Sequence, residues 1–376
     1  MSSVAEKPVI FRTVATRSGH KLGLLTLNAP AAMNAVDLDM VNRIDRQLKR
    51  WEENDDVVAV IMRGAGDKAF SAGGDIRKLY DSMCAEGDEQ YRYADQFFSG
   101  EYGKNYRVHL FTKPLIAWGN GFVMGGGLGL FIGANHRVGT ETLKLAWPEV
   151  RIGLFPDVAA TWYLSHLTQP AGYWMALTGM QMNAVDCREL RLTQYALAHS
   201  QFDDMKALLK NTEWTANNAE NHHRVRDCLH RLEADCPQGL PESQMHPAWD
   251  DISALLVDYD LKAIAQRFAA YAGSNEWVQQ GIRQFQAGCP ATAHLIMEQL
   301  QRGQCMSLKE AVQWELVLAY QSVRHPDFGE GIRAMVVDKD FSPQWQHASV
   351  DEVPRSWVEG LMQSPWPAAE HPLRDL

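Results

Sequence analysis

A recurring succession of strand, glycine loop and helix is the feature that most restricts the fold of this chain. Residues 57–66 (VVAVIMRGAG) form a nearly continuous apolar run, typical of a strand buried on both faces. The loop FSAGGDI (70–76) follows and leads into a helical pattern. A second strand pattern, PLIAWGNG (114–121), precedes the triplet Gly125-Gly126-Gly127, which opens a helix expected over 125–134. The irregular intervals favour successive strand–strand–helix turns over a solenoid of fixed period.

Other segments of the N-terminal half complete an α/β pattern. Residues 9–28 predict two strands around a turn at Ser18-Gly19. Residues 37–53 predict an amphipathic helix, because apolar side chains recur at helical spacing opposite a charged face. The segments HRVGT and LKLAW predict two further short strands.

The C-terminal half has a different character. From about Pro170 helical patterns dominate, and the polar residues 211–250 predict an exposed connection or short helices. We therefore expect a strand-rich core over residues 1–210 and a mainly helical region over residues 211–376.

Composition restricts the partners and the compartment. The chain of 376 residues has a net charge of -10, which argues against non-specific nucleic-acid binding. Six cysteines without a CxxC pair indicate reduced thiols. The first ten residues, MSSVAEKPVI, lack a signal-peptide pattern, and no apolar run reaches membrane-spanning length. We therefore expect a cytoplasmic protein with neither a nucleic-acid nor a membrane partner.

The two glycine loops can present backbone N–H groups to an anionic oxygen. Gly73 and Gly74 allow close approach to a ligand, and Gly126 would lie at the positive end of a helix dipole. A simple tight turn and close helix–sheet packing are the structural alternatives. Because each loop follows a buried strand, the pair favours a two-donor oxyanion hole.

Two carboxylates follow the triplet. Glu149 and Asp157 flank the apolar residues IGLF, so a hydrophobic pocket could raise their pKa values. A surface turn for Glu149 and a helix N-cap for Asp157 are the alternatives. Oxyanion donors beside an acid–base pair suggest acyl chemistry. The histidines lack metal-ligand spacing and no GxSxG motif occurs, so we expect neither a metal nor a serine triad.

These motifs together resemble the crotonase (enoyl-CoA hydratase/isomerase) superfamily. The likeness spans roughly residues 10–350 and rests on TLNAPAAMNAV, AFSAGGDI, GFVMGGGLGL and WPEVRIGLFPD in this order. Within the superfamily, GLFPDV, EYGKNY and DFGEGIRAMVVDKDFSPQW are similar to the 3-hydroxyisobutyryl-CoA hydrolase family. The resemblance implies an α/β spiral of β-β-α turns with a helical C-terminal region packed on it.

The resemblance also implies an acyl-CoA substrate, in which coenzyme A is part of the substrate and no separate cofactor is needed. The N–H groups of Gly74 and Gly126 would hold the thioester oxygen. The adenine end would lie near residues 71–75, and the CoA-binding residues would be Ala72, Gly73, Gly74 and Asp75.

The acidic residues would do the chemistry and bind the acyl group. Glu149 would either activate a water or attack the carbonyl carbon directly. Asp157 would orient the water or the substrate hydroxyl and assist proton transfer to the thiolate. Glu101, in EYGKNY, would bind the substrate's hydroxyl; a solvated glutamate on a helix surface is its alternative.

One departure separates this chain from the hydratases that it resembles. They carry a catalytic glutamate where this chain has Gly129, and usually a glycine where it has Asp157. Hydration needs two carboxylates flanking the double bond. We therefore expect hydrolysis of a short branched 3-hydroxyacyl-CoA, most of all 3-hydroxyisobutyryl-CoA in valine breakdown.

Other departures and alternatives stay open at this point. Ala31 and Ala32 replace a basic residue of relatives, and Ala159 and Ala160 replace glycines, which would reshape the pocket wall. An enoyl-CoA isomerase using Glu149 alone and a non-catalytic CoA-binding protein are the rival functions. A homo-oligomer is possible, because cores of this superfamily often form trimers.

Overall fold

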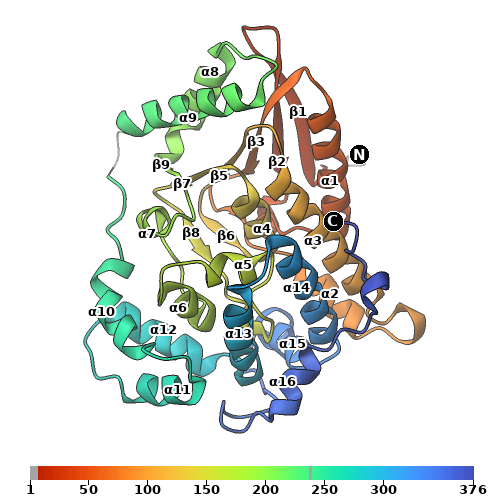
Figure 1. The fold of residues 1–376 in the computed structure, drawn as a ribbon, viewed down its shortest axis with the longest axis vertical. Coiled ribbons are helices and arrows are strands. Elements are labelled where there is room, and N and C mark those ends of the chain that lie inside the picture. The colour runs from red at the N-terminus through yellow and green to blue at the C-terminus, as the bar shows by residue number, and fades with distance from the viewer. Residues whose placement is uncertain (1–6, 237–238) are drawn as a thin grey trace. The chain divides into compact units, whose positions relative to one another are not determined.

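The computed structural model describes residues 7–236 and 239–376 (Figure 1). They form two compact units, each described by itself below. The sheet unit comprises residues 7–74, 104–145 and 182–243, and the helical unit comprises residues 75–103, 146–181 and 244–376. The predicted boundary at residue 210 separates a repeating core from its C-terminal extension, which is a different kind of division. That boundary therefore stays a prediction.

The sheet unit is built on a six-stranded sheet of order β1-β2-β3-β5-β7-β9. β1 and β2 are antiparallel, and the other neighbours run parallel. A second sheet has the order β4-β6-β8. The strands are β1 Val9–Ala15, β2 Lys21–Leu27, β3 Val57–Gly64, β4 Ala69–Ser71, β5 Leu115–Gly119, β6 Phe122–Met124, β7 His136–Thr140, β8 Lys144–Ala146 and β9 Tyr195–Leu197.

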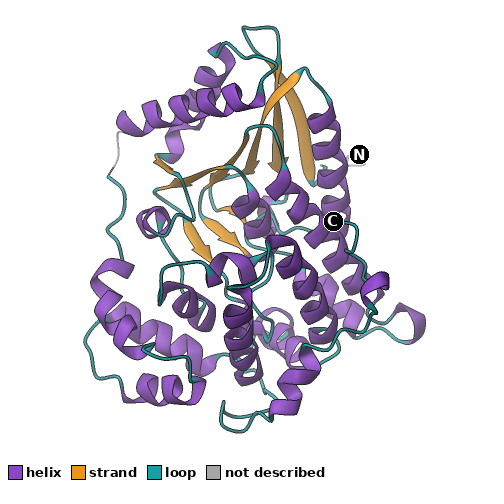
Figure 2. Ribbon diagram, viewed as in Figure 1, coloured by secondary structure: helices purple, strands orange, loops and turns teal. Residues whose placement is uncertain are grey.

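The chain passes repeatedly from the larger sheet to the smaller one and then into helical structure. β3 is followed by β4 and α2 (Ile76–Met83), and β5 by β6 and α4 (Gly125–Gly133). β7 is followed by β8 and a short 3-10 helix, η3 (Glu149–Ile152). Figure 2 shows the strands and helices of this progression. This order of elements confirms the strand–strand–helix rhythm expected from the two glycine loops. The elements that the sequence predicted begin and end within about two residues of their predicted bounds.

The first helix shows why its sequence folds as predicted. α1 (Leu38–Glu53) begins at Asp37, whose side chain accepts a hydrogen bond from the N–H of Met40. Its buried residues are Met40, Val41, Ile44, Leu48 and Trp51, spaced along one face. Strands β3 and β5 are buried along nearly their whole length, as their apolar runs predicted: Val60 and Ile116 are fully buried.

The prediction for residues 211–250 was wrong in one respect. Instead of an exposed connection or short helices, the chain forms α9 (Asn218–Ala234), a helix of 17 residues. Its buried side chains, Val225, Leu229 and Leu232, recur at helical spacing and join the core beneath the sheet. Three well-spaced apolar residues anchor a helix that looks polar by composition. Residues 237 and 238 lie outside the described residues, as do residues 1–6 of the N-terminal segment considered above.

The remaining helices make up most of the helical unit. The sheet unit also holds α7 Ala184–Glu189 and α8 Phe202–Asn211, and α3 (Arg92–Leu110) contributes residues to both units. The helical unit holds α5 Ala160–Ser165, α6 Ala171–Thr178, α10 Met245–Leu255, α11 Leu261–Ala270, α12 Glu276–Ala287, α13 Pro290–Gly303, α14 Leu308–Ser322, α15 Pro326–Ile332 and α16 Arg355–Leu361. Across residues 7–236 and 239–376, none of the helices has the length and apolarity needed to cross a bilayer.

Candidate active site

The two glycine loops lie side by side in the sheet unit. A Cβ added to Gly73 would stand 3.9 Å from the nitrogen of Gly126, and one added to Gly127 would stand 2.3 Å from the Cβ of Ser71. Gly73 also has a φ of +121°, in the region that favours glycine. A Cβ on Gly127 would clash with Ser71, and the backbone conformation of Gly73 would strain any other residue, so both glycines are needed here.

The backbone around both expected donors is held in place. Val36 donates from its N–H to the oxygen of Gly73 over 2.9 Å, and Val36 and Gly74 form a parallel bridge. Gly126 lies in the first turn of α4, where N–H groups have no acceptor within the helix. The N-cap residue, Met124, gives this turn no side-chain hydrogen bond. Gly74 and Gly126 therefore belong to two adjoining, fixed backbone segments, one of which offers helix N-terminal donors.

The other two expected CoA-binding residues have local structural contacts. The N–H of Ala72 donates to the oxygen of Met33 over 3.0 Å. The side chain of Asp75 caps α2 by accepting from the N–H of Lys78 over 3.3 Å. These contacts fix the ends of the FSAGGDI loop and leave the role of these two residues in CoA binding as a prediction.

Four carboxylates buried in the helical unit lie close enough for their charges to interact. Glu101 is 1% exposed, Glu149 and Asp157 are each 4% exposed, and Glu315 of α14 is fully buried. The structural alternatives for Glu149, a surface turn, and for Glu101, a solvated helix position, are therefore wrong. Ionised groups are rarely buried without a reason, so this cluster is the centre of the candidate site.

Glu149 is the first residue of η3, and the chain turns tightly behind it. Gly153 ends η3 with a φ of +73°, and a Cβ there would lie 2.5 Å from the oxygen of Asp327. Among the described residues, Oε2 of Glu149 has no hydrogen-bond partner. Burial raises the pKa of Glu149 to about 8, and the nearby charges of Glu315 and Glu101 add to this. A carboxylate kept from water in this way is a strong base when it is ionised.

Asp157 is bonded through both its side chain and its backbone. Its Oδ2 accepts from the hydroxyl of Tyr102 over 2.9 Å, and its carbonyl oxygen accepts from the indole N–H of Trp147 over 3.1 Å. The N-cap of α5 is Ala159, so the side chain of Asp157 does not cap that helix. Burial raises the pKa of Asp157 well above its ordinary range, and repulsion from Glu149 raises it further. A protonated Asp157 is thus available as an acid.

Three functional candidates escaped the sequence analysis. Tyr102 follows Glu101 in EYGKNY, and its hydroxyl reaches Asp157. Glu315 accepts from the N–H of Ala159 over 2.7 Å and of Thr161 over 2.8 Å. Gln299 of α13 donates to the oxygen of Pro156 over 2.6 Å. The sequence held one signal for Glu315: it is a glutamate within the apolar stripe of residues 308–322. The stripe's buried residues include Ala311, Val312, Leu316 and Ala319.

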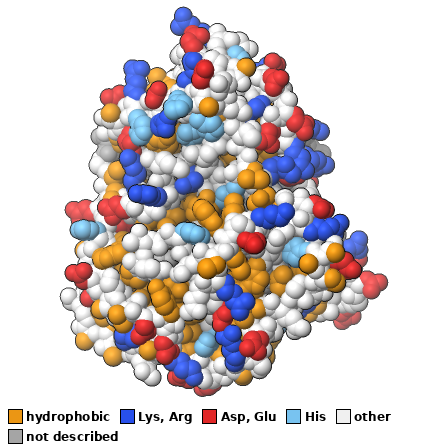
Figure 3. All heavy atoms as spheres, viewed as in Figure 1, with side chains coloured by type: hydrophobic (Ala, Val, Ile, Leu, Met, Phe, Trp, Pro, Cys, Tyr) orange, Lys and Arg blue, Asp and Glu red, His pale blue; other side chains and the backbone are white. Residues whose placement is uncertain are grey.

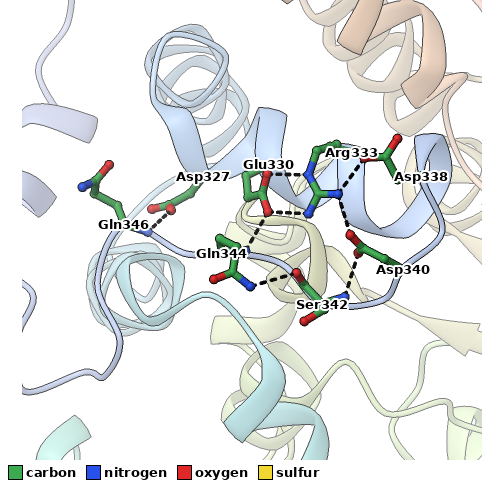
Figure 4. Close-up of polar contacts among 8 residues, drawn as sticks. All are labelled: Asp327, Glu330, Arg333, Asp338, Asp340, Ser342, Gln344 and Gln346. Carbon is green, nitrogen blue, oxygen red and sulfur yellow. Dashed lines mark hydrogen bonds and ion pairs between the residues drawn. The ribbon is translucent and has the colours of Figure 1, made fainter.

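The C-terminal motif DFGEGIRAMVVDKDFSPQW forms a network around Arg333 (Figure 4). The guanidinium donates twice to Glu330, over 2.8 and 2.7 Å, and once each to Asp338 and Asp340, over 2.7 and 2.6 Å. Glu330 also accepts from the N–H of Gln344 over 2.6 Å. The motif thus fastens residues 338–344 to the end of α15, which is a structural role.

Comparison with known proteins gives one family and one fold. Residues 22–362 match the family model described as enoyl-CoA hydratase/isomerase. The mitochondrial 3-hydroxyisobutyryl-CoA hydrolase of Xenopus laevis is 32% identical over 91% of this chain and 86% of that protein. The Homo sapiens protein of the same name is 33% identical over 88% of this chain and 83% of that protein.

Solved structures agree over nearly the whole chain. A structure described as an enoyl-CoA hydratase from Rhodobacter sphaeroides 2.4.1 has a TM-score of 0.82 and 29% identity, covering 96% of this chain and 98% of that one. One described as a carnitinyl-CoA dehydratase from Mycobacterium thermoresistibile has a TM-score of 0.83 and 27% identity, covering 97% and 98%. They confirm the predicted crotonase-like α/β fold with its helical C-terminal region. The chain belongs to the enoyl-CoA hydratase/isomerase family.

Proposed function

We propose that this protein hydrolyses short branched 3-hydroxyacyl-CoA thioesters, and above all converts 3-hydroxyisobutyryl-CoA to 3-hydroxyisobutyrate and CoA, a step of valine breakdown. The observation that carries the proposal is the buried pair Glu149 and Asp157, combined with glycine at position 129. Relatives named 3-hydroxyisobutyryl-CoA hydrolase, about a third identical over most of the chain, support the same substrate.

In the proposed reaction, the N–H groups of Gly74 and Gly126 stabilise the negative charge that develops on the thioester oxygen. Ionised Glu149 either attacks the carbonyl carbon or removes a proton from an attacking water. The C–S bond then breaks, and the CoA thiolate takes a proton that protonated Asp157 can supply. On the first route, water hydrolyses the acyl–Glu149 anhydride to release the acid and regenerate the carboxylate.

The remaining predicted residues bind and orient the substrate. Glu101 would accept a hydrogen bond from the 3-hydroxyl group, and Tyr102 keeps the Asp157 carboxyl in a fixed direction. CoA enters and leaves as part of the substrate and the product, with contacts from Ala72, Gly73, Gly74 and Asp75. This scheme uses no separate cofactor and no metal.

Each rival function leaves at least one feature of the structure unexplained. A hydratase needs a second carboxylate at the double bond, and the position of that residue in hydratases is held here by Gly129, buried in α4. A double-bond isomerase would need Glu149 alone, which leaves the buried and costly Asp157 without a purpose. A binding protein would need the glycines but neither buried acid.

Partners and compartment are part of the proposal. The net charge of -10, and the interspersed acidic and basic side chains on the face in Figure 3, favour a small-molecule substrate over a nucleic acid. We propose the cytoplasm as the compartment and leave a homo-oligomer open, although the relatives are named as mitochondrial. Cell fractionation and light scattering would test these points.

The decisive assay is thiol release from 3-hydroxyisobutyryl-CoA, 3-hydroxypropionyl-CoA and crotonyl-CoA, measured with a chromogenic disulfide. Wild type should release thiol from both hydroxyacyl esters without hydrating crotonyl-CoA, and Glu149→Gln should not. No release from any ester would overturn the proposal. In oxygen-18 water, one turnover that labels the Glu149 carboxylate marks the anhydride route, whereas activated water labels only the free acid.

A further inference from the structure

The chain takes an unfavourable path immediately after Asp157. Val158 has a φ of 58° and Ala159 a φ of 72°, so two consecutive residues other than glycine are left-handed. A β-branched residue such as Val158 is a genuine outlier in this region. Such a turn persists only where its surroundings hold it.

Two helices from the C-terminal half hold this turn. Glu315 of α14 accepts from the N–H groups of Ala159 and Thr161, over 2.7 and 2.8 Å. Gln299 of α13 donates to the oxygen of Pro156 over 2.6 Å and to Oγ1 of Thr161 over 2.7 Å. Because α5 has no side-chain cap of its own, the Glu315 carboxylate satisfies donors that would otherwise be orphaned.

The choice of a carboxylate for this contact is informative. Glu315 is fully buried, and its carboxylate accepts from uncharged donors, the N–H groups of Ala159 and Thr161 and the Thr161 hydroxyl. Burying a charge without a cation is costly, and a glutamine of the same shape would avoid that cost. An amide, however, offers one acceptor oxygen, whereas the two oxygens of Glu315 each accept from a different N–H group.

We propose that Glu315 is a positioning residue for thioester hydrolysis: by accepting from Ala159 and Thr161 it holds the left-handed turn and so keeps the Asp157 carboxyl at the Tyr102 hydroxyl. This inference rests on the proposed function for the role of Asp157. Glu315 itself bonds to backbone donors of the turn, so it acts through Asp157 and not on the substrate.

The charge of Glu315 should also affect the pH–rate profile, which a purely structural contact would not change. The groups that act on Glu149 and Asp157 are Glu101 and Tyr102 of α3 and Glu315 of α14. After burial, the charge of Glu315 is the largest contribution that raises the pKa of Glu149. Removing that charge should lower the pKa of Glu149, so the acidic limb of the pH–rate profile should move to lower pH.

The test is a double-mutant cycle on Glu315 and Ala159. Glu315→Gln should lower kcat about tenfold or more through misplacement of Asp157, with KM changed less than about threefold. Ala159→Gly alone sets the baseline. In the double variant, glycine adopts the left-handed φ without strain, so it should recover at least about threefold of the lost kcat.

Hydrogen exchange gives a second readout, independent of activity. In Glu315→Gln, the amides of Ala159 and Thr161 should exchange faster. Glu310→Gln is the matched control, because Glu310 is exposed on the same helix and its Oε2 accepts from the N–H and the hydroxyl of Ser307. This variant should leave both kcat and that exchange unchanged.

The outcomes separate the two proposals. Glu315→Gln with a kcat within about threefold of wild type, or a loss that Ala159→Gly does not relieve, overturns the positioning role. Wild type without thiol release overturns the proposed function instead. In that case the exchange of Ala159 and Thr161 decides alone: faster exchange in Glu315→Gln keeps Glu315 as the residue that holds the turn, and unchanged exchange removes it.

Discussion

In the proposed reaction, the glycine loops of the sheet unit and the carboxylate cluster of the helical unit contribute in opposite ways. The loops work because side chains are missing: backbone segments approach until a Cβ on Gly127 would lie 2.3 Å from that of Ser71. The cluster works because side chains are present and shut off from water. Backbone donors do not titrate, so their strength is independent of pH, whereas the charge of the cluster depends on it.

The two regions also differ in how far along the chain their parts lie. Each loop is a short segment between a strand and a helix, and its proposed function depends on a few adjacent glycines. The cluster needs Tyr102, Asp157 and Glu315, from α3, from a turn and from α14, with contacts that span more than 150 residues. We therefore expect substitutions in the loops to act locally, and substitutions in the cluster to spread to their neighbours.

Glu149→Gln should have the largest effect, because the amide can neither accept a proton nor attack the carbonyl carbon. We expect kcat to fall by about 10³-fold or more, with the fold kept. Thiol release and circular dichroism would be measured together. Glu359→Gln, an exposed change beside Arg355, is the control. Residual activity within tenfold of wild type would remove Glu149 from the mechanism, by the usual size of base catalysis.

Gly126→Pro tests the loops in the same assay. Proline is tolerated in the first turn of a helix but has no N–H group, so an oxyanion donor is lost and kcat should fall about 10²- to 10³-fold. Gly126→Ala keeps the N–H group and is the matched control. If kcat falls equally in both variants, activity requires a small residue at position 126 and not its N–H donor.

Asp157→Asn should reduce kcat about 10²-fold, since the amide keeps the shape of the side chain but cannot deliver the proton. Tyr102→Phe, which removes only the 2.9 Å hydrogen bond to Asp157, should cost less. Survival of activity within a few-fold in Asp157→Asn would mean that the cluster needs only one acid, and the isomerase interpretation would regain support.

The pH dependence of stability separates the cluster from surface acids. Burial raises the pKa values of Glu149 and Glu315 to about 8 and about 7, from an ordinary 4.5. The folded state therefore binds more protons than the unfolded state between these limits. The stability that these groups contribute is fully present below pH 4.5 and is lost as the pH rises through 7 and 8.

Thermal unfolding from pH 5 to pH 9 would measure this effect. The Tm of wild type should fall across the range, and it should fall less in Glu149→Gln, which cannot ionise at that position. Salt-bridged surface acids such as Asp45, whose pKa is lowered by Lys49 and Arg107, lose their contribution only at acidic pH. Equal slopes in the two proteins would contradict the raised pKa of Glu149.

What the sequence could predict follows the same division. Six of the strands (β1, β2, β3, β5, β7 and β8), α1, α4 and the glycine loops were predictable because periodicity and glycine chemistry are local. The three-residue strands β4, β6 and β9 were not predicted, because so short a segment shows no periodicity. The burial of Glu149 and Asp157 was predictable only as a possibility, since the flanking residues IGLF do not show what covers them. Glu315 and Gln299 were not predictable, because a polar residue within an apolar helix stripe does not identify its distant partner. The length of α9 was hidden by its polar composition.

Arg333→Gln should have the smallest effect on activity and a clear effect on stability. It compares the charge network around Arg333 with the buried carboxylate cluster. Figure 4 shows three carboxylates converging on this guanidinium. Its loss leaves Glu330, Asp338 and Asp340 to repel one another. The Tm should therefore drop more than in Arg355→Gln, because the side chain of Arg355 is 61% exposed, against 24% for Arg333. High salt should narrow that difference by screening the repulsion. Within residues 7–236 and 239–376, the hydrogen bonds of the Arg333 side chain all go to its own motif. Its loss should therefore leave kcat within about twofold, the range usual for surface positions away from a site. A larger loss of kcat would show that the motif shapes the site and does more than fasten the chain.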